Sequence, residues 1–435
     1  MSISNITEKR HQQIEALREQ ITRETGKTPE QLYDEREKRI RDACELKKPD
    51  RIPLLILGDT SSLSGLPRSA AYYDPVPWNE AVINTTFEFE PDAGMGDFGT
   101  SGMCWEILDV KNRLWPGGPL PPDYTYQFVE GEYMKAEEYD LFLRDPSDFI
   151  IRYYLPRIYG ILAPLQKLPP LNRLHHGFEG ITALFTNPEF KQLATRLEKA
   201  GKALEDYRRM AGDLQQALTL LGFPPFSYFG SVGGAPFDTV SSFFRGMQGA
   251  MMDMYRQPEK LLEMCDKILE LQIANTVPVD PSNKEYPKRA AIPLWRGDKV
   301  FMSETHFRKF YWPGLKKALQ ASIDMGYIPI PGFEAHFGER LECLRELPKG
   351  KVVAFVDHTD VLQAKKILEG HTCIVACDPQ SLKLAPLKEA EAYYKKIIDK
   401  CAGDGGLIIT ITLPETGKRE ELKAFIKTIK EYATY

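Results

Sequence analysis

The sequence predicts an α/β fold, a (β/α)8 TIM barrel that is extended at its N-terminus by helices and interrupted by insertions. Two observations predict this fold. Eight short apolar runs follow one another along the chain, and segments with helical spacing of apolar residues separate most of them. Such alternation is typical of parallel strands joined by helices. The chain has 435 residues, which is enough for eight strand–helix units with insertions.

Residues 1–48 are predicted to be a helical extension. They are rich in residues that favour helices, and Ile14, Leu17 and Ile21 recur at loose helical spacing. Residues 49–435 are predicted to form the barrel. Within the barrel, the stretch of about 105–135 is rich in proline, glycine and aromatic residues, which indicates an insertion or a lid.

Each element of the barrel is predicted from its local pattern. Strands are predicted where compact apolar runs lie between charged or turn-forming residues, at residues 51–57, 92–99 (ending near Asp97), 225–234, 290–295, 328–334, 351–357, 372–378 and 406–413. Helices are predicted from helical spacing, at residues 77–91, 136–165, 188–221, 237–255, 258–276, 304–326, 359–368, 387–401 and 419–432.

The composition argues against several classes of protein. The formal net charge is -5, so no basic excess is present for nucleic-acid binding. No window approaches 18 continuous apolar residues, and the N-terminus has no apolar signal-peptide core, so neither a membrane span nor a targeting segment is expected. The seven cysteines are scattered and odd in number, which indicates free thiols in a reducing cytoplasm.

Polar residues that end the predicted strands form the candidate site, because the C-terminal strand ends of such barrels carry the active site. Carboxylate, imidazole and thiolate groups are zinc ligands. The residues predicted on this basis to bind a metal are Glu334, His336, His358 and Cys377. The alternative interpretation is that these side chains are satisfied by hydrogen bonds around the barrel rim.

Other polar residues are assigned to catalysis and substrate binding. Asp97 and Asp357 are predicted to donate or accept protons. Four residues are predicted to contact the substrate: Asp59, Trp295, Arg296 and His176. Two of these have a second interpretation. Arg296 could pair with Asp298 rather than with a substrate anion, and His176 lies in an irregular segment where a structural or surface role is the alternative.

Four segments resemble proteins of the uroporphyrinogen decarboxylase superfamily: residues 230–271, 297–336, 359–379 and 405–426. The resemblance spans roughly 50–430 and implies two broad chemistries, cofactor-free decarboxylation of a tetrapyrrole or methyl transfer through a corrinoid. The arginine-rich signature with which the decarboxylases grip propionate groups is missing from residues 57–74, which read LGDTSSLSGLPRSAAYYD. The chain therefore resembles the corrinoid-dependent methyltransferase branch.

This resemblance implies zinc and cobalamin as cofactors and a small methylated substrate, such as an aromatic methyl ether that undergoes O-demethylation. The methyltransferases carry a zinc motif similar to His-x-Cys-Gly after the fifth strand, whereas this chain reads Glu334-Ala-His336 there and has no cysteine in its last strand. This harder ligand set favours an oxygen or nitrogen substrate over a thiol. No Asp-x-His-x-x-Gly motif for corrinoid binding occurs, so the cobalamin is expected on a separate corrinoid protein.

Two alternatives to a methyltransferase are open. The first is a cofactor-free decarboxylase or lyase, because Asp97 lies about where the decarboxylases place their key aspartate. The second is a scaffold or binding protein without catalysis. Activity in metal-free protein, without a corrinoid partner, would identify the decarboxylase.

Overall fold

A curled parallel sheet of six strands lies at the centre of the computed structural model, which describes residues 3–57, 60–95, 99–228, 231–412 and 418–435. The strand order is β1-β8-β7-β6-β5-β4, and every neighbouring pair is parallel. The strands are β1 (Leu54–Leu57), β4 (Lys288–Leu294), β5 (Tyr327–Phe333), β6 (Val353–Val356), β7 (Cys373–Ala376) and β8 (Leu407–Thr412). Six predicted strands are therefore confirmed, most of them shortened at their ends.

The second and third predicted strands are wrong in the residues that the structure describes. Residues 92–95 and 225–228 form no named strand. Pro225 has no N–H to donate to a ladder, but Pro329 and Pro331 lie within β5, so proline by itself does not account for the difference. Asp97, at the end of the second predicted strand, lies outside the described residues.

Both segments nevertheless lie against the edges of the sheet. The Asp92 N–H donates to the Leu54 carbonyl of β1 at 2.9 Å, and the Tyr228 N–H donates to the Arg289 carbonyl of β4 at 2.8 Å. The Gly94 N–H donates at 2.9 Å to the carbonyl of Pro224, the residue that precedes the other segment. The mixed α/β architecture is thus a six-stranded sheet with one of these segments at each edge.

The concave face of the sheet carries its own apolar core. Alternate residues of a strand point to opposite faces, and one buried cluster joins the inward set Leu55, Ile328, Ile330, Val353, Cys373, Val375 and Ile408. Ile40, Ala43 and Cys44 of α2 (Pro29–Cys44) belong to the same cluster. The helix α2 therefore closes the concave face near the N-terminal strand ends. Its own N-terminus is fixed by Thr28, which forms a capping box with Gln31.

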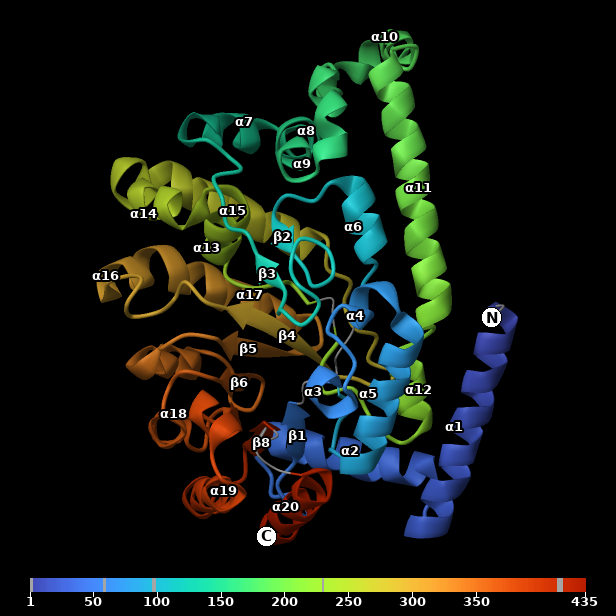
Figure 1. Cartoon of the computed structure of the whole chain (residues 1–435). Coiled ribbons are helices and arrows are strands. Elements are labelled where there is room, and N and C mark those ends of the chain that lie inside the picture. Colours follow the sequence, from blue (N-terminus) through green and yellow to red (C-terminus); the bar gives the residue numbers. More distant parts are fainter. Residues whose placement is uncertain (1–2, 58–59, 96–98, 229–230, 413–417) are drawn as a thin grey trace.

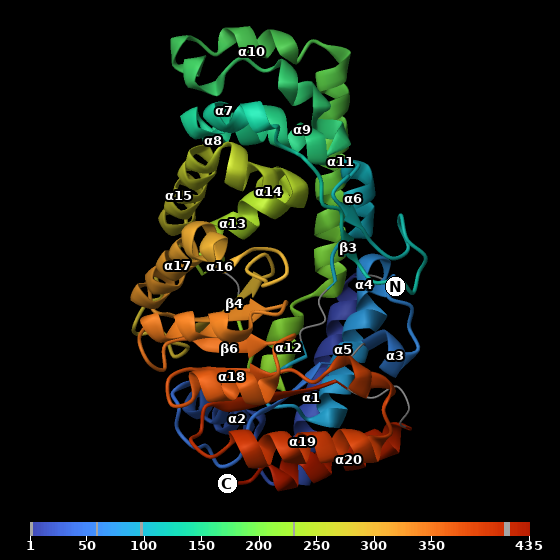
Figure 2. The ribbon, with the colours of Figure 1, turned by 90° about the vertical axis from the view of Figure 1, so that its left-hand side faces the viewer.

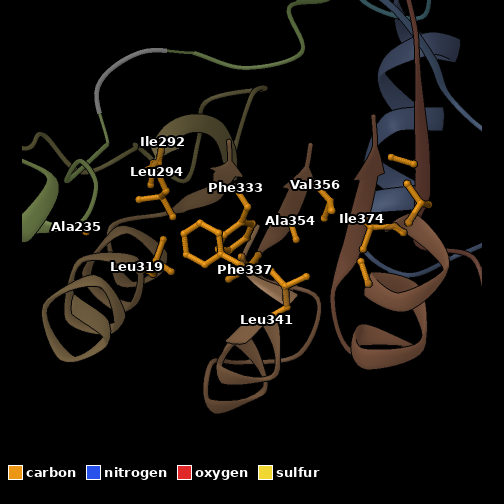
Figure 3. Packing of buried hydrophobic residues seen from close by; sticks show 14 of the residues in the cluster. Ala235, Ile292, Leu294, Leu319, Phe333, Phe337, Leu341, Ala354, Val356 and Ile374 are labelled. Carbon is orange, nitrogen blue, oxygen red and sulfur yellow. The ribbon is translucent and has the colours of Figure 1, made fainter. Parts of the chain in front are cut away.

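Helices cover the convex face of the sheet. Figure 3 shows Leu294, Phe333 and Val356 packed towards this layer, with Leu319 of α17 beside them. The elements that follow the central strands are α16 (Glu304–His306), η6 (Phe307–Tyr311), α17 (Trp312–Asp324), η7 (Gly338–Glu346), α18 (Val361–Leu368), η8 (Gln380–Leu384), α19 (Leu387–Cys401) and α20 (Arg419–Tyr432). The helices predicted for this half of the chain are confirmed.

The first half of the chain contributes further helices around the sheet. These are α1 (Ile3–Thr25), α3 (Thr60–Ser64), α4 (Ala70–Tyr73), α5 (Pro75–Phe89), α12 (Leu214–Leu220), α13 (Pro236–Thr239), η5 (Val240–Phe244), α14 (Gly246–Arg256) and α15 (Pro258–Ala274). α1 and α2 occupy the region predicted to be helical at the N-terminus. In the described part of the chain, no helix is long and apolar enough to cross a membrane.

The predicted insertion is a small, separate layer beside the rim. It contains α6 (Gly102–Leu108) and the antiparallel pair β2 (Arg113–Leu114) and β3 (Gln127–Phe128). Trp105 and Trp115 pack edge to face with ring centroids 5.1 Å apart. Phe128 packs in the same way on Phe243 of η5 at 5.4 Å, so the insertion is anchored near α14.

A helical subassembly follows the insertion and extends away from the sheet. It comprises η1 (Ala136–Glu138), α7 (Tyr139–Arg144), α8 (Pro146–Phe149), η2 (Ile150–Tyr154), α9 (Leu155–Ile158), η3 (Gly160–Lys167), η4 (Leu171–His176), α10 (Glu179–Leu184) and α11 (Pro188–Ala211). Both views place α7 and α9 above α14 and α15, with α10 at the top (Figures 1 and 2). The long helix α11 returns from this outer end towards the sheet.

Candidate active site

Strand alternation selects which polar residues face the concave side of the sheet. The inner core contains Ile330 of β5, Val353 of β6 and Val375 of β7. Counting onward in steps of two places Glu334, Asp357 and Cys377 on that same side, directly after the strand ends. The backbones of these positions still follow the sheet, because the Cys377 N–H donates to the Val356 carbonyl at 3.1 Å and the Glu334 N–H to the Leu294 carbonyl at 3.0 Å.

The charge of Asp357 acts on the side chains that follow both neighbouring strands. Partial burial raises the pKa of Glu334 above its ordinary value, and the nearby charge of Asp357 raises it further. Burial also raises the pKa of the Cys377 thiol, and Asp357 again contributes. Asp357 therefore acts on both residues from the strand between them. Burial and the Asp357 charge both oppose the ionisation of Glu334 and Cys377, which favours a cation or a proton at these two groups.

The two predicted histidine ligands lie at the outer edge of this group. The ring Nδ1 of His336 is 3.3 Å from the backbone carbonyl of His358. His358 Nε2 is 3.6 Å from Asp357 Oδ2, and the His358 side chain is 56% exposed. His336 is exposed as well. The structure thus brings Glu334, Asp357 and Cys377 onto the concave side, where Glu334 is exposed to solvent like both imidazoles, Asp357 is half-buried and Cys377 is buried.

The arrangement of the predicted zinc ligands is not that of a formed metal centre. Within the described residues, no group of three or more His, Cys, Asp or Glu side chains is placed to hold a metal ion. The donor chemistry is suitable, because a cation would offset the burial, and the smaller effect of the Asp357 charge, that raise the pKa of Glu334 and Cys377. Ligation by three side chains would require the exposed His336 or His358 to change rotamer.

The end of β4 contacts the insertion through Arg296. Its guanidinium forms an ion pair with Glu130, so the alternative pairing with Asp298 is not what the structure contains. Asp298 instead accepts a hydrogen bond from the His336 N–H at 3.1 Å. The insertion therefore reaches the rim at Arg296, whose buried Nε has no hydrogen-bond partner in the described residues.

The inner face of β4 is open to solvent. Ala291 and Pro293 lie on the face opposite to the buried Ile292 and Leu294, and both are exposed. Trp295 follows on the same face by alternation, and its indole N–H donates to the Ser242 hydroxyl at 2.7 Å. A small substrate could therefore approach the strand ends along β4.

Asp238 of α13 is a residue that the sequence interpretation missed. Its buried carboxylate accepts hydrogen bonds from the Tyr311 hydroxyl at 2.7 Å, the Arg296 N–H at 3.0 Å and the Trp295 N–H at 3.4 Å. Burial raises its pKa to about 7, against the lowering effect of these donors. An acidic residue in the apolar run APFDTV was the available signal, because a buried charge needs a structural or functional partner.

Three other predicted site residues are Asp59, Asp97 and His176. Asp59 and Asp97 lie outside the described residues. His176 is exposed and ends η4, next to α10 at the outer end of the helical subassembly (Figure 1). The structure does not bring it to the strand ends. Cys373, which is inward like Cys377 but deeper, is part of the inner core.

Comparisons with known proteins give a fold but no family. No family model matches the chain, and no curated protein matches it. Among solved structures, the chain is similar to a methyltransferase from Methanosarcina mazei, with a TM-score of 0.53 and 14% sequence identity over 91% of this chain and 98% of that chain. At this identity the likeness shows the fold alone, and it extends over nearly the whole length of both proteins.

Proposed function

We propose that the protein is a methyltransferase that moves a methyl group between a small methylated substrate and a separate corrinoid protein. The observation that carries the proposal is the acidic group Glu334–Asp357–Cys377 at the strand ends, in a fold shared with a methyltransferase. The eight predicted strand positions would close into a (β/α)8 barrel, with residues 92–95 and 224–228 completing the ring between β1 and β4.

A zinc ion fits the donor chemistry of this group. Glu334 and Cys377 would hold it from the concave side, and His336 or His358 would complete the set after a rotamer change. When bound, zinc would supply Lewis acidity to a leaving oxygen. An aromatic methyl ether is the proposed substrate class, because the set contains only one thiolate and suits an oxygen atom better than a thiol.

The protein's own residues would bind the substrate and supply a proton to the leaving oxygen. During demethylation the carbon–oxygen bond would break, the oxygen would keep the electron pair and take up one proton, and the methyl group would leave as a formal cation to the reduced corrinoid of the partner protein, which would supply the electron pair for the new bond. Asp357, on the strand between those of Glu334 and Cys377, would deliver that proton. The open inner face of β4 would admit the aromatic ring, and the rim beside the insertion would accept the corrinoid protein.

The test combines purified protein, a reduced corrinoid protein from the same cell and a set of aromatic methyl ethers. The expected result is demethylated product in equal amount to methylated corrinoid, with loss of activity after chelation and recovery with zinc. Glu334→Gln should lower both bound zinc and activity, whereas Glu339→Gln should change neither, because Glu339 is an exposed carboxylate that pairs with Lys299.

Two outcomes would contradict the proposal. Turnover that persists after exhaustive chelation, without any corrinoid protein, would favour the decarboxylase or lyase. Stoichiometric zinc that survives replacement of both Glu334 and Cys377 would place the metal elsewhere.

A further inference from the structure

A cavity rich in cations lies at the opposite end of the sheet from the candidate active site. Its volume is about 230 Å³, and its lining contains the cations Arg36, Arg39, Arg51 and Lys430 and the carboxylates Glu35 and Glu90. The side chains come from α2, from the residue that precedes β1, from the end of α5 and from α20, which Figure 1 shows below the sheet. The N-terminal face of such folds usually serves stability, so this charge pattern requires an explanation.

Two of the four cations are fully matched by carboxylates. Arg39 binds Asp50 with two hydrogen bonds of 2.8 and 2.7 Å, and it also contacts Asp92 at 2.5 Å. Arg51 binds the same buried Asp92 with bonds of 2.6 and 2.8 Å. The Leu54 N–H donates to Asp92 at 2.7 Å as well. This network anchors α2 to β1. Both oxygen atoms of Asp50 and both of Asp92 already accept hydrogen bonds within it.

The other two cations have little compensation. Arg36 donates to the Gly222 carbonyl at 2.7 Å and stacks over the Phe223 ring at 4.1 Å, but it has no carboxylate partner in the described residues. Lys430 donates to the Phe89 carbonyl at 3.2 Å, and its nearest carboxylate is Glu90 at 3.7 Å. The Glu90 side chain is itself 54% exposed, and Glu35, the other carboxylate of the lining, forms an ion pair with Lys27. The cavity therefore carries an excess of positive charge.

Burial lowers the pKa of both side chains. Burial lowers the pKa of Lys430 to about 8; Glu90 and Asp92 oppose that effect, and Arg51 and Arg36 add to it. Burial likewise lowers the pKa of Arg36 to about 10. A bound anion would offset the desolvation of both groups, because charge-assisted hydrogen bonds favour their protonated forms.

We propose that this cavity binds a small tetrahedral oxyanion, either inorganic phosphate or the phosphoryl group of a small metabolite, between Arg36 and Lys430. The volume limits the ligand, because pockets for larger molecules run from roughly 300 to 1,000 Å³. The anion links α2 to α20 and to the end of α5. Its effect is on the stability of the folded chain, and the site is independent of the methyltransferase proposal.

The test measures binding and thermal unfolding of the full chain with inorganic phosphate and, separately, with glycerol phosphate, against chloride at equal ionic strength. Phosphate should raise the Tm of the wild-type protein. Lys430→Met should fold normally, since it removes a poorly compensated buried charge, and should weaken binding by about tenfold or more. Lys427→Met is the matched control, because Lys427 lies on the same helix with its side chain 78% exposed.

A second variant and a second anion make the result decisive. Arg36→Lys keeps a charge but loses the planar guanidinium, and it should also weaken phosphate binding. Sulfate, which does not titrate in this range, should bind less tightly as the pH rises through 8, because Lys430 loses its proton. Equal binding of glycerol phosphate would identify a phosphoryl metabolite, and weaker binding would identify the inorganic ion. Unchanged affinity in Lys430→Met, or no stabilisation by phosphate beyond that by chloride, would overturn the proposal.

Discussion

Tyr311 donates its phenolic hydroxyl to Asp238 at 2.7 Å, inside the layer between α13 and α17. The same carboxylate accepts the backbone N–H of Arg296 at 3.0 Å, so one buried side chain ties two convex-side elements to the end of β4. Burial raises the pKa of Asp238 to about 7. The charge of this residue therefore changes near neutral pH, directly behind the rim of the candidate site.

The first prediction concerns the pH dependence of stability. The folded protein keeps the Asp238 proton up to about pH 7, whereas an unfolded chain releases it near pH 4. Stability should therefore fall as pH rises from about 4 to 7 by on the order of 1 kcal/mol per pH unit from this group, and then level off. Asp238→Asn should remove that contribution. Urea unfolding of both proteins between pH 5 and 8 measures the difference, and parallel pH profiles would refute it.

The second prediction tests the hydrogen bond itself. The Tyr311 hydroxyl lowers the pKa of Asp238, in opposition to burial. Tyr311→Phe removes this donor and should shift the pH window of the Asp238 effect upward. The urea experiment in the Tyr311→Phe background, with and without Asp238→Asn, separates the shift from a general loss of stability. A midpoint that stays in place would mean that Tyr311 has no influence on the ionisation of Asp238.

Strands were predicted correctly where a compact apolar run is sufficient to indicate a buried strand. Runs such as 351–357 and 406–413 are bounded by charged residues or glycine, and both became central strands. The segments at 92–95 and 225–228 form no named strand, and proline does not explain this, because β5 contains Pro329 and Pro331. Their positions beside β1 and β4 depend on long-range hydrogen bonds, which a local pattern does not contain.

The residues of the candidate site that follow from local strand alternation were predicted, and those that depend on tertiary contacts were not. Strand ends identify Glu334, Asp357 and Cys377, because period-two alternation continues the inward face past the last paired residue. Asp238 was missed because its role comes from tertiary contacts with Tyr311 and the β4 backbone. His176 is exposed at the end of η4. Its irregular local sequence did not indicate that it lies in the helical subassembly rather than at the strand ends.

The third prediction follows from the central position of Asp357. Its negative charge raises the pKa of Glu334 and contributes to the raised pKa of Cys377. Asp357→Asn should lower both pKa values, so Cys377 should be alkylated about two- to fivefold faster at a fixed mildly alkaline pH. Mass spectrometry of the Cys377 peptide in chelator-treated protein measures the rate. Glu339→Gln is the control, and equal rates in all three proteins would show that Asp357 does not act on the thiol.

The fourth prediction concerns the anchor beneath the sheet. Asp92 is fully buried and neutralises Arg39 and Arg51. Asp92→Ala leaves two guanidinium groups poorly compensated and should cost about 3–5 kcal/mol of unfolding free energy. Asp50→Ala should cost about 1 kcal/mol or less, because the Asp50 side chain is 64% exposed. Urea unfolding distinguishes them, and similar losses would contradict the assignment of Asp92 as the central acceptor.

The last prediction concerns the attachment of the insertion to the rim. Arg296 holds Glu130 by an ion pair, and both side chains are partly buried, at 18% and 29% exposure. Arg296→Ala should loosen the segment around β3 by about 1 kcal/mol, which corresponds to roughly fivefold faster amide exchange there if local opening controls exchange. The contact of Phe128 with Phe243 remains, so the insertion should stay docked.

Hydrogen exchange followed by mass spectrometry reports this change on the peptide that spans residues 125–132. Arg308→Ala is the control, because Arg308 forms only exposed ion pairs with Glu304 and Glu346. The charge-swapped pair Arg296→Glu with Glu130→Arg should restore slow exchange if the attraction between the two side chains holds the segment. Fast exchange in the swapped pair would instead assign the effect to the packing of the Arg296 side chain over Phe301, whose ring centre lies 5.4 Å from its guanidinium.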